Sequence, residues 1–169
     1  MAALLHIPVG VVVDRIKADS QWIDYVWQPS AVLVGAPEAQ PWTRLSGDDG
    51  RASYYAGRAS IELYRSDTGN YRDNLAGDCT LWVVLTPAEA DPPYTLFMVT
   101  ADPTEGEAQT ETGVNLVEAV AMPDAVRQVL EDFVAEHHVE QTFYKRKRDR
   151  ADPDALARRV QSPRGGDDD

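Results

Sequence analysis

One stretch of the sequence constrains the fold more than any other: an amphipathic helix that follows a series of strand-like segments. Its apolar and aromatic side chains recur with one histidine at spacings of three and four, which places six residues on one helical face: Val126, Val129, Leu130, Phe133, Val134 and His137. Pro123 suits the first turn because its missing N–H costs nothing there, and Asp124 favours the positive end of the helix dipole. A helix with such a stripe has to cover one layer of a packed core.

The segments before this helix predict strands. Apolar residues alternate or run together over residues 7–13, 22–34 with an interruption at Pro29, 52–64, 79–86, 94–100 and 114–121. Gly and Pro in residues 35–50 and acidic residues in 102–113 predict two long loops, the first anchored by Trp42. Residues 67–70 are predicted as a turn, and residues 71–76 as a short helical turn or more loop.

About six strands followed by one helix predict a mainly β fold of the α+β class, either an antiparallel sandwich or a partly closed barrel, with a C-terminal amphipathic helix. The pattern alone leaves these two architectures open. The length of 169 residues fits one domain and a tail. We expect a β-rich globular domain with its capping helix over residues 1–140. Residues 141–169 are expected to form a basic tail with a short helix starting near Asp152–Pro153 and a frayed end.

The charge is distributed unevenly along the chain. The net charge is −12, but residues 1–140 carry 22 acidic and 8 basic side chains, whereas residues 141–169 carry 8 basic and 6 acidic ones. An acidic body repels phosphate backbones, so nucleic-acid binding by the whole protein is disfavoured. The basic tail can dock on an acidic partner or fold back on its own acidic body, and the sequence does not choose between these alternatives.

The chain offers few groups for catalysis. Cys79 is the single cysteine, which excludes an internal disulfide and a multi-cysteine metal site within one chain. As a nucleophile it would need a histidine base, and its place at the start of an apolar strand favours a buried, inert thiol. Because His137 and His138 are adjacent, they point in different directions and do not form a metal-binding pair at i and i+4. No metal or cofactor is expected.

Other candidate motifs are weaker. Asp48 and Asp49 lie between glycines and are predicted to form a solvated turn rather than a cation site. Glycine-rich phosphate loops are absent, and no apolar run reaches the roughly 20 residues that span a bilayer, so we expect a cytoplasmic protein. Trp22, Tyr25 and Trp27 form either a ligand platform or, as small β-rich domains favour, packing in the core or at its rim.

Several segments together resemble a bacterial family known as domain of unknown function 3305. They are Ile7–Val13, Trp22 with Val26–Pro29, Leu81–Val84, Thr100–Pro103 and, most specifically, Lys145-Arg146-Lys147-Arg148-Asp149-Arg150-Ala151-Asp152-Pro153. The resemblance covers nearly the whole chain. It implies a genomic context, because the genes of this family commonly lie beside those of molybdenum-dependent formate dehydrogenase, and it implies no catalytic residues.

The leading hypothesis is therefore a non-catalytic accessory protein for maturation or assembly of a molybdenum-dependent formate dehydrogenase. Its partner would be a dehydrogenase subunit or a maturation factor, and the candidate partner-binding residues are Phe143, Tyr144, Lys145, Arg146, Lys147, Arg148, Arg150, Arg158 and Arg159. One alternative is an enzyme or carrier that handles the molybdenum cofactor through Cys79. Another is a small regulatory or nucleic-acid-binding module that uses the basic tail.

Overall fold

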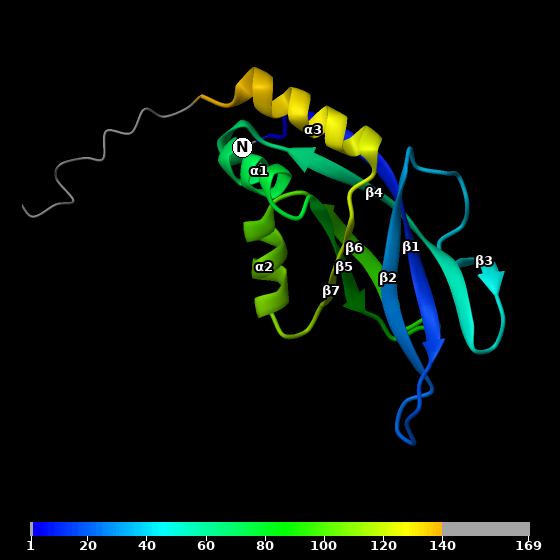
Figure 1. Cartoon of the computed structure of the whole chain (residues 1–169). Helices are drawn as coiled ribbons and strands as arrows, with labels where there is room; N and C mark the ends of the chain where they lie inside the picture. The colour runs from blue at the N-terminus through cyan, green and yellow to red at the C-terminus, as the bar shows by residue number, and fades with distance from the viewer. Residues whose placement is uncertain (1, 140–169) are drawn as a thin grey trace, which may run out of the picture. The chain divides into compact units, whose positions relative to one another are not determined.

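The computed structural model of the chain describes residues 2–139, which fold around two antiparallel sheets (Figure 1). One sheet has the strand order β2-β1-β4-β3 and the other β6-β5-β7. Their bounds are Leu5–Lys17 for β1, Tyr25–Val34 for β2, Thr43–Gly47 for β3, Arg51–Leu63 for β4, Thr80–Pro87 for β5, Tyr94–Thr100 for β6 and Leu116–Ala121 for β7. The mainly β, α+β prediction is confirmed. The described residues form no closed barrel.

Strand β1 is the centre of the larger sheet. It pairs with β2 on one side and with β4 on the other, and the side chains of Val9, Val11 and Val13 are fully buried between the sheets. Each partner strand carries an extra residue opposite the same short stretch of β1: Ser30 in β2 and Ala56 in β4. Pro29 adjoins the first of these bulges on an edge strand, where a missing N–H is tolerated.

The smaller sheet supplies the other wall of the core. Leu81, Val83 and Leu85 of β5 are fully buried and join one hydrophobic cluster with the inner residues of β1 and β4. The predicted hairpin between residues 79–86 and 94–100 is confirmed, with β5 pairing to β6 in antiparallel register. Strand β4 lies close to β6, and β2 lies close to β7, so the two sheets approach each other along both edges.

Helix α3, Asp124–His137, confirms the helix predicted from the apolar stripe. Val126, Leu130 and Phe133 are at most 4% exposed, and Val129 and Val134 pack against the same core. The His137 ring contacts the Phe133 ring at a tilt, with 4.6 Å between their centres. Figure 1 shows α3 beside α1 at one end of the domain, while the β1–β2 hairpin extends from the opposite end. The helix therefore closes the end of the core that lies away from the hairpin.

Three predictions for the loops are wrong. Residues 35–50 contain β3, whose five residues are all exposed and which exists because it pairs with β4. The supposed acidic loop contains α2, Pro103–Glu111, which begins at Asp102 with a side-chain cap to the Thr104 N–H. The supposed turn after Asp67 is the start of α1, Thr68–Ala76, preceded by a 3-10 turn at Arg65–Asp67.

The anchoring role predicted for Trp42 is confirmed. Its backbone adopts φ 66° and its N–H donates to the Tyr55 carbonyl, while its ring packs against the core and meets Trp27 edge-on. Within residues 2–139, no helix is long and apolar enough to cross a membrane.

Candidate functional site

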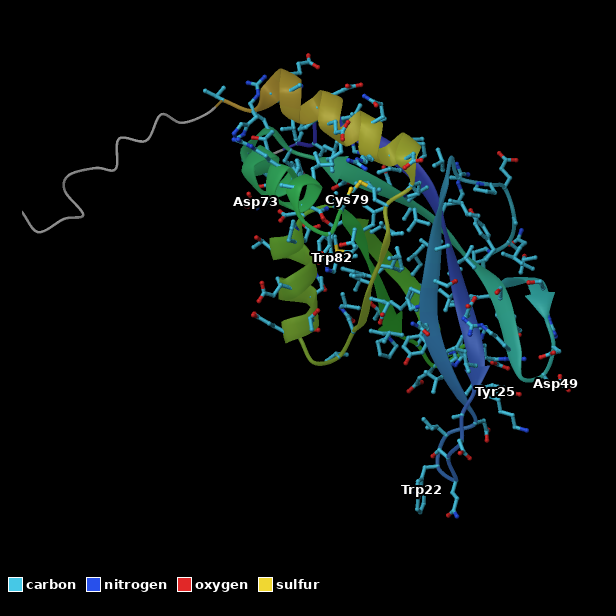
Figure 2. The ribbon with its side chains drawn as sticks, in the orientation of Figure 1. Trp22, Tyr25, Asp49, Asp73, Cys79 and Trp82 are labelled. Carbon is cyan, nitrogen blue, oxygen red and sulfur yellow. The ribbon has the colours of Figure 1, made fainter. Side chains whose placement is uncertain are left out.

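The tip of the β1–β2 hairpin, residues 18–24, carries the most exposed large apolar side chain of the described domain. Trp22 is 90% exposed and its neighbour Ile23 is 54% exposed. Figure 2 shows Trp22 at the end of the hairpin, far from Cys79 and Trp82. The expectation that Trp22 packs in the core or at its rim is therefore wrong: the hairpin carries it beyond the sheet.

The backbone of this tip is held by specific hydrogen bonds. The Ala18 N–H donates to the Asp24 carbonyl at 3.0 Å, and the Trp22 N–H donates to Ser20 Oγ at 3.1 Å. The Lys17 N–H donates to the Gly50 carbonyl at 2.8 Å, which ties the base of the hairpin to the loop before β4. Trp22 is therefore exposed to solvent on a turn that hydrogen bonds hold in place.

Below the tip lies an aromatic base, formed by Arg15, Tyr25, Trp27, Trp42 and Tyr54. The Arg15 guanidinium lies 4.2 Å from the centre of the Tyr25 ring and 5.4 Å from that of Tyr54, within the range of cation–π attraction. The Trp27 ring lies 5.8 Å from the rings of both Trp42 and Tyr54. Of the three aromatic residues for which the sequence favoured packing over a ligand platform, Tyr25 and Trp27 therefore do pack, and they support the hairpin.

A polar cluster braces the same strands. Asp14 is 6% exposed and accepts hydrogen bonds from Ser53 Oγ at 2.7 Å, Arg51 Nη2 at 2.8 Å and Ser30 Oγ at 3.1 Å. Burial opposes its ionised form, but the bonds from Ser53, Arg51 and Ser30 outweigh burial and lower the pKa of Asp14 below its ordinary value. The cluster joins β1, β2 and β4 near the base of the hairpin.

A second surface feature is a groove of about 330 Å³ beside strands β4 and β6, called here the β4–β6 groove. Its lining includes Arg58, Ser60, Glu62, Phe97, Met98 and, from α2, Glu105. Phe97 is 57% exposed, and the Tyr64 hydroxyl donates to Glu62 Oε2 at 2.6 Å. The groove therefore combines an apolar wall with both signs of charge.

Acidic side chains crowd one end of this groove. Burial raises the pKa of Glu105, and nearby Asp102, Asp67 and Glu62 raise it further, while a hydrogen bond with Thr100 opposes the shift. Burial and the neighbouring Asp102 likewise raise the pKa of Asp67. Asp102 itself is engaged, because it caps α2 and accepts from Asn70 Nδ2 at 3.3 Å.

The residues that the sequence suggested for chemistry lie elsewhere. Cys79 is half-buried at φ 53°, with its Sγ 3.8 Å from Met122 Sδ, and its use as a reacting group stays a prediction. His6 lies beside Ser60 and Glu62, and His138 contacts Thr68 Oγ1 at 3.1 Å.

In the part of the chain that the structure describes, no group of three or more His, Cys, Asp or Glu side chains could hold a metal ion. The candidate partner-binding residues from Phe143 to Arg159 lie outside the described residues, so their role also stays a prediction.

The fold and its surfaces define the class of protein first: an α+β domain of two antiparallel sheets whose longest hairpin presents exposed apolar side chains. The chain belongs to the family described as protein of unknown function (DUF3305), whose model matches residues 8–147. This confirms the family resemblance and leaves its link to formate dehydrogenase as a proposal. No curated protein and no solved structure matches the chain.

Sequence reasoning missed both the hairpin tip and the groove. A signal for the tip was present, because Trp22 comes two positions after the turn residues Asp19 and Ser20, and side chains at a turn between long strands project from the sheet. The groove had no such signal, since it joins β4 to β6 and to a helix that the sequence had suggested as a loop.

Proposed function

We propose that this protein is a non-catalytic accessory protein that assists maturation or assembly of a molybdenum-dependent formate dehydrogenase in the cytoplasm. It acts by docking on a dehydrogenase subunit or a maturation factor. The link to this enzyme rests on the genomic context that the family resemblance implies. The docking role rests on one observation, the exposure of Trp22 and Ile23 at a braced hairpin tip.

The energetics support docking through the tip. An exposed tryptophan offers about 200 Å² of surface, so its burial in a partner pocket contributes up to about 5 kcal/mol at about 25 cal/mol per Å², before the costs of association. Those costs are smaller when the binding residue is already ordered, and the hydrogen bonds at Ala18 and Trp22 order this turn. Tryptophan is also the residue type most enriched among those that dominate interface energies.

The charges beside the tip indicate the partner's chemistry. Asp19 and Asp24 flank Trp22 in the turn, and the rest of the domain is strongly acidic. A fitting partner surface is an apolar pocket with a basic rim, because opposite charges around a buried core speed association and exclude wrong partners. The predicted basic tail adds a second contact of opposite polarity, to an acidic patch on the same assembly.

The test is affinity capture of the tagged full-length protein from its own cells during growth with formate oxidation. We expect dehydrogenase subunits or their maturation factors to be recovered. Trp22→Ala with Ile23→Ala should weaken this binding about thirtyfold, which corresponds to about 2 kcal/mol for a dominant interface residue. A version ending at Thr142 measures the contribution of the tail.

The matched control is Val34→Ala with Val114→Ala, since these side chains are 53% and 66% exposed and lie in other segments. This control should keep full binding. Equal recovery of the dehydrogenase with the tip variant and the wild-type protein would show that the tip is not the docking site. If dehydrogenase components are recovered with none of the versions, the accessory function itself is wrong.

A further inference from the structure

The β4–β6 groove has the features of a peptide-binding site that is separate from the hairpin. It runs beside two strand edges. Strand β3 pairs with β4 only between Ala52 and Tyr55, so residues 58–63 of β4 pair with β1 alone. Strand β6 pairs with β5 alone. In the described domain, the facing sides of β4 and β6 form no sheet with each other although the two strands lie close together, so a peptide in the groove would lie along their side chains rather than add a strand between them.

The charges of the groove are separated along β4. Arg58, Ser60 and Glu62 are all exposed and alternate with inward side chains, so they share the outer face of the strand. With a rise of about 3.3 Å per residue, Arg58 and Glu62 lie about 13 Å apart. One end of the groove is cationic, and the other carries Glu62 together with Glu105.

Glu62 has two partners among the described residues: the uncharged Tyr64 hydroxyl, and His6, which lies 4.0 Å away and is a cation only when protonated. The burial of Glu105 beside other carboxylates keeps its pKa raised. A cationic side chain placed between Glu62 and Glu105 would relieve this repulsion. Phe97 and Met98 lie along the same groove and offer apolar and aromatic surface to the stem of a long basic side chain or to an apolar neighbour.

We infer that the β4–β6 groove binds an extended peptide segment of a protein partner. The segment carries an arginine or lysine at the Glu62–Glu105 end, an apolar side chain against Phe97 and an acidic side chain four residues from the cation, opposite Arg58. In an extended chain these three side chains point to the same face, because residues i, i+2 and i+4 do so. The inference goes beyond the proposed function and does not depend on the hairpin.

The experiment uses a fluorescent nine-residue peptide, Gly-Thr-Arg-Thr-Leu-Thr-Glu-Thr-Gly, and a second peptide with the same residues in reverse order. Binding to the full chain is measured by fluorescence anisotropy. We expect one order to bind more tightly, and replacement of its arginine by neutral citrulline to weaken binding at least about tenfold, as for the loss of a charge-assisted hydrogen bond. Phe97→Ala should also weaken it.

The decisive comparison is between two double variants that each remove two negative charges. Glu62→Gln with Glu105→Gln should weaken binding at least about tenfold. Glu107→Gln with Glu111→Gln removes the same charge from exposed positions of α2 and should change binding less than about twofold, as for screened surface charges. Equal weakening by both pairs would mean nonspecific attraction to an acidic body and would overturn the inference. Absence of binding by either peptide order, or unchanged binding of the citrulline peptide, would overturn it as well.

Discussion

Asn74 of helix α1 connects three parts of the fold through one buried amide. Asn74 is only 4% exposed. Its side-chain Nδ2 donates to the Thr80 carbonyl at 2.8 Å and to the Ala101 carbonyl at 3.0 Å. The same side chain also accepts from the Thr80 N–H at 3.0 Å. The amide thus ties α1 to the start of β5 and to the segment between β6 and α2.

The variant Asn74→Ala removes all three bonds and leaves backbone groups of Thr80 and Ala101 without this partner. At about 1 kcal/mol for each hydrogen bond, we expect the free energy of unfolding to fall by about 3 kcal/mol. For a domain of this size the loss corresponds to a fall of about 10 °C in the melting temperature. Alanine is the better helix former, so the helix itself does not account for the loss.

The assay is urea unfolding of the full chain followed by circular dichroism and tryptophan fluorescence, so that two probes check for a single transition. The control is Asn70→Ala, which makes the same chemical change on the same helix but removes a single side-chain contact, 3.3 Å long, to Asp102. We expect the control to lose less than about 1 kcal/mol. If Asn74→Ala loses no more than the control, the reasoning about this buried amide is refuted.

Two further predictions concern acid stability and have opposite signs. Because the folded state lowers the pKa of Asp14, its contribution to stability is present above its unfolded pKa of about 3.9 and is lost as the pH falls through the lowered value. Asp14→Asn should therefore destabilise the protein at neutral pH and by less as the pH falls below about 4, which urea unfolding at a series of pH values measures; a pH-independent difference would contradict this. Because the folded state raises the pKa of Glu105, stability is greatest below its unfolded pKa of about 4.3 and falls as the pH rises through the folded value. Glu105→Gln should raise the melting temperature at pH 7 and leave it nearly unchanged at about pH 4, and a lower melting temperature at pH 7 would count against the raised pKa.

The elements that the sequence predicted correctly are those whose own side chains build the core. The apolar stripe of α3 and the alternation in β4 and β5 follow directly from which residues must avoid water. The missed elements bury little. Strand β3 is exposed throughout, and the buried residue of α2 is Gly106, whose α-carbon sits so close to Trp82 that an added Cβ would lie 2.5 Å from the ring.

The sequence nevertheless contained a signal for the start of helix α2. Asp102 followed by Pro103 is an N-cap and first-turn pair, and it outweighs the acidic composition that suggested a loop. The groove was beyond the reach of local patterns, because Glu62 and Glu105 are 43 positions apart and meet only through the packing of β4, β6 and α2. The prediction for Trp22 at the hairpin tip was wrong for a different reason. Aromatic residues are usually buried, and Trp22 departs from that tendency.

The two bulges at Ser30 and Ala56 affect the direction of the hairpin because each adds one residue to a strand that pairs with β1, whatever the type of that residue. Both lie opposite the same stretch of β1, so the larger sheet changes its twist there on both sides at once. Between the bulge at Ser30 and the hairpin tip, the arm formed by residues Tyr25–Pro29 keeps Trp27 on the face that contacts Trp42. Because Val12 pairs with Ala31 and Val13 with Pro29, loss of Ser30 would remove the bulge and leave the other side chains of that arm on their present faces, whereas loss of one regularly paired residue would turn the side chains beyond it to the opposite face. The direction in which this arm presents its side chains therefore depends on the number of regularly paired residues in it, and the bulge at Ser30 adds only a local change of twist.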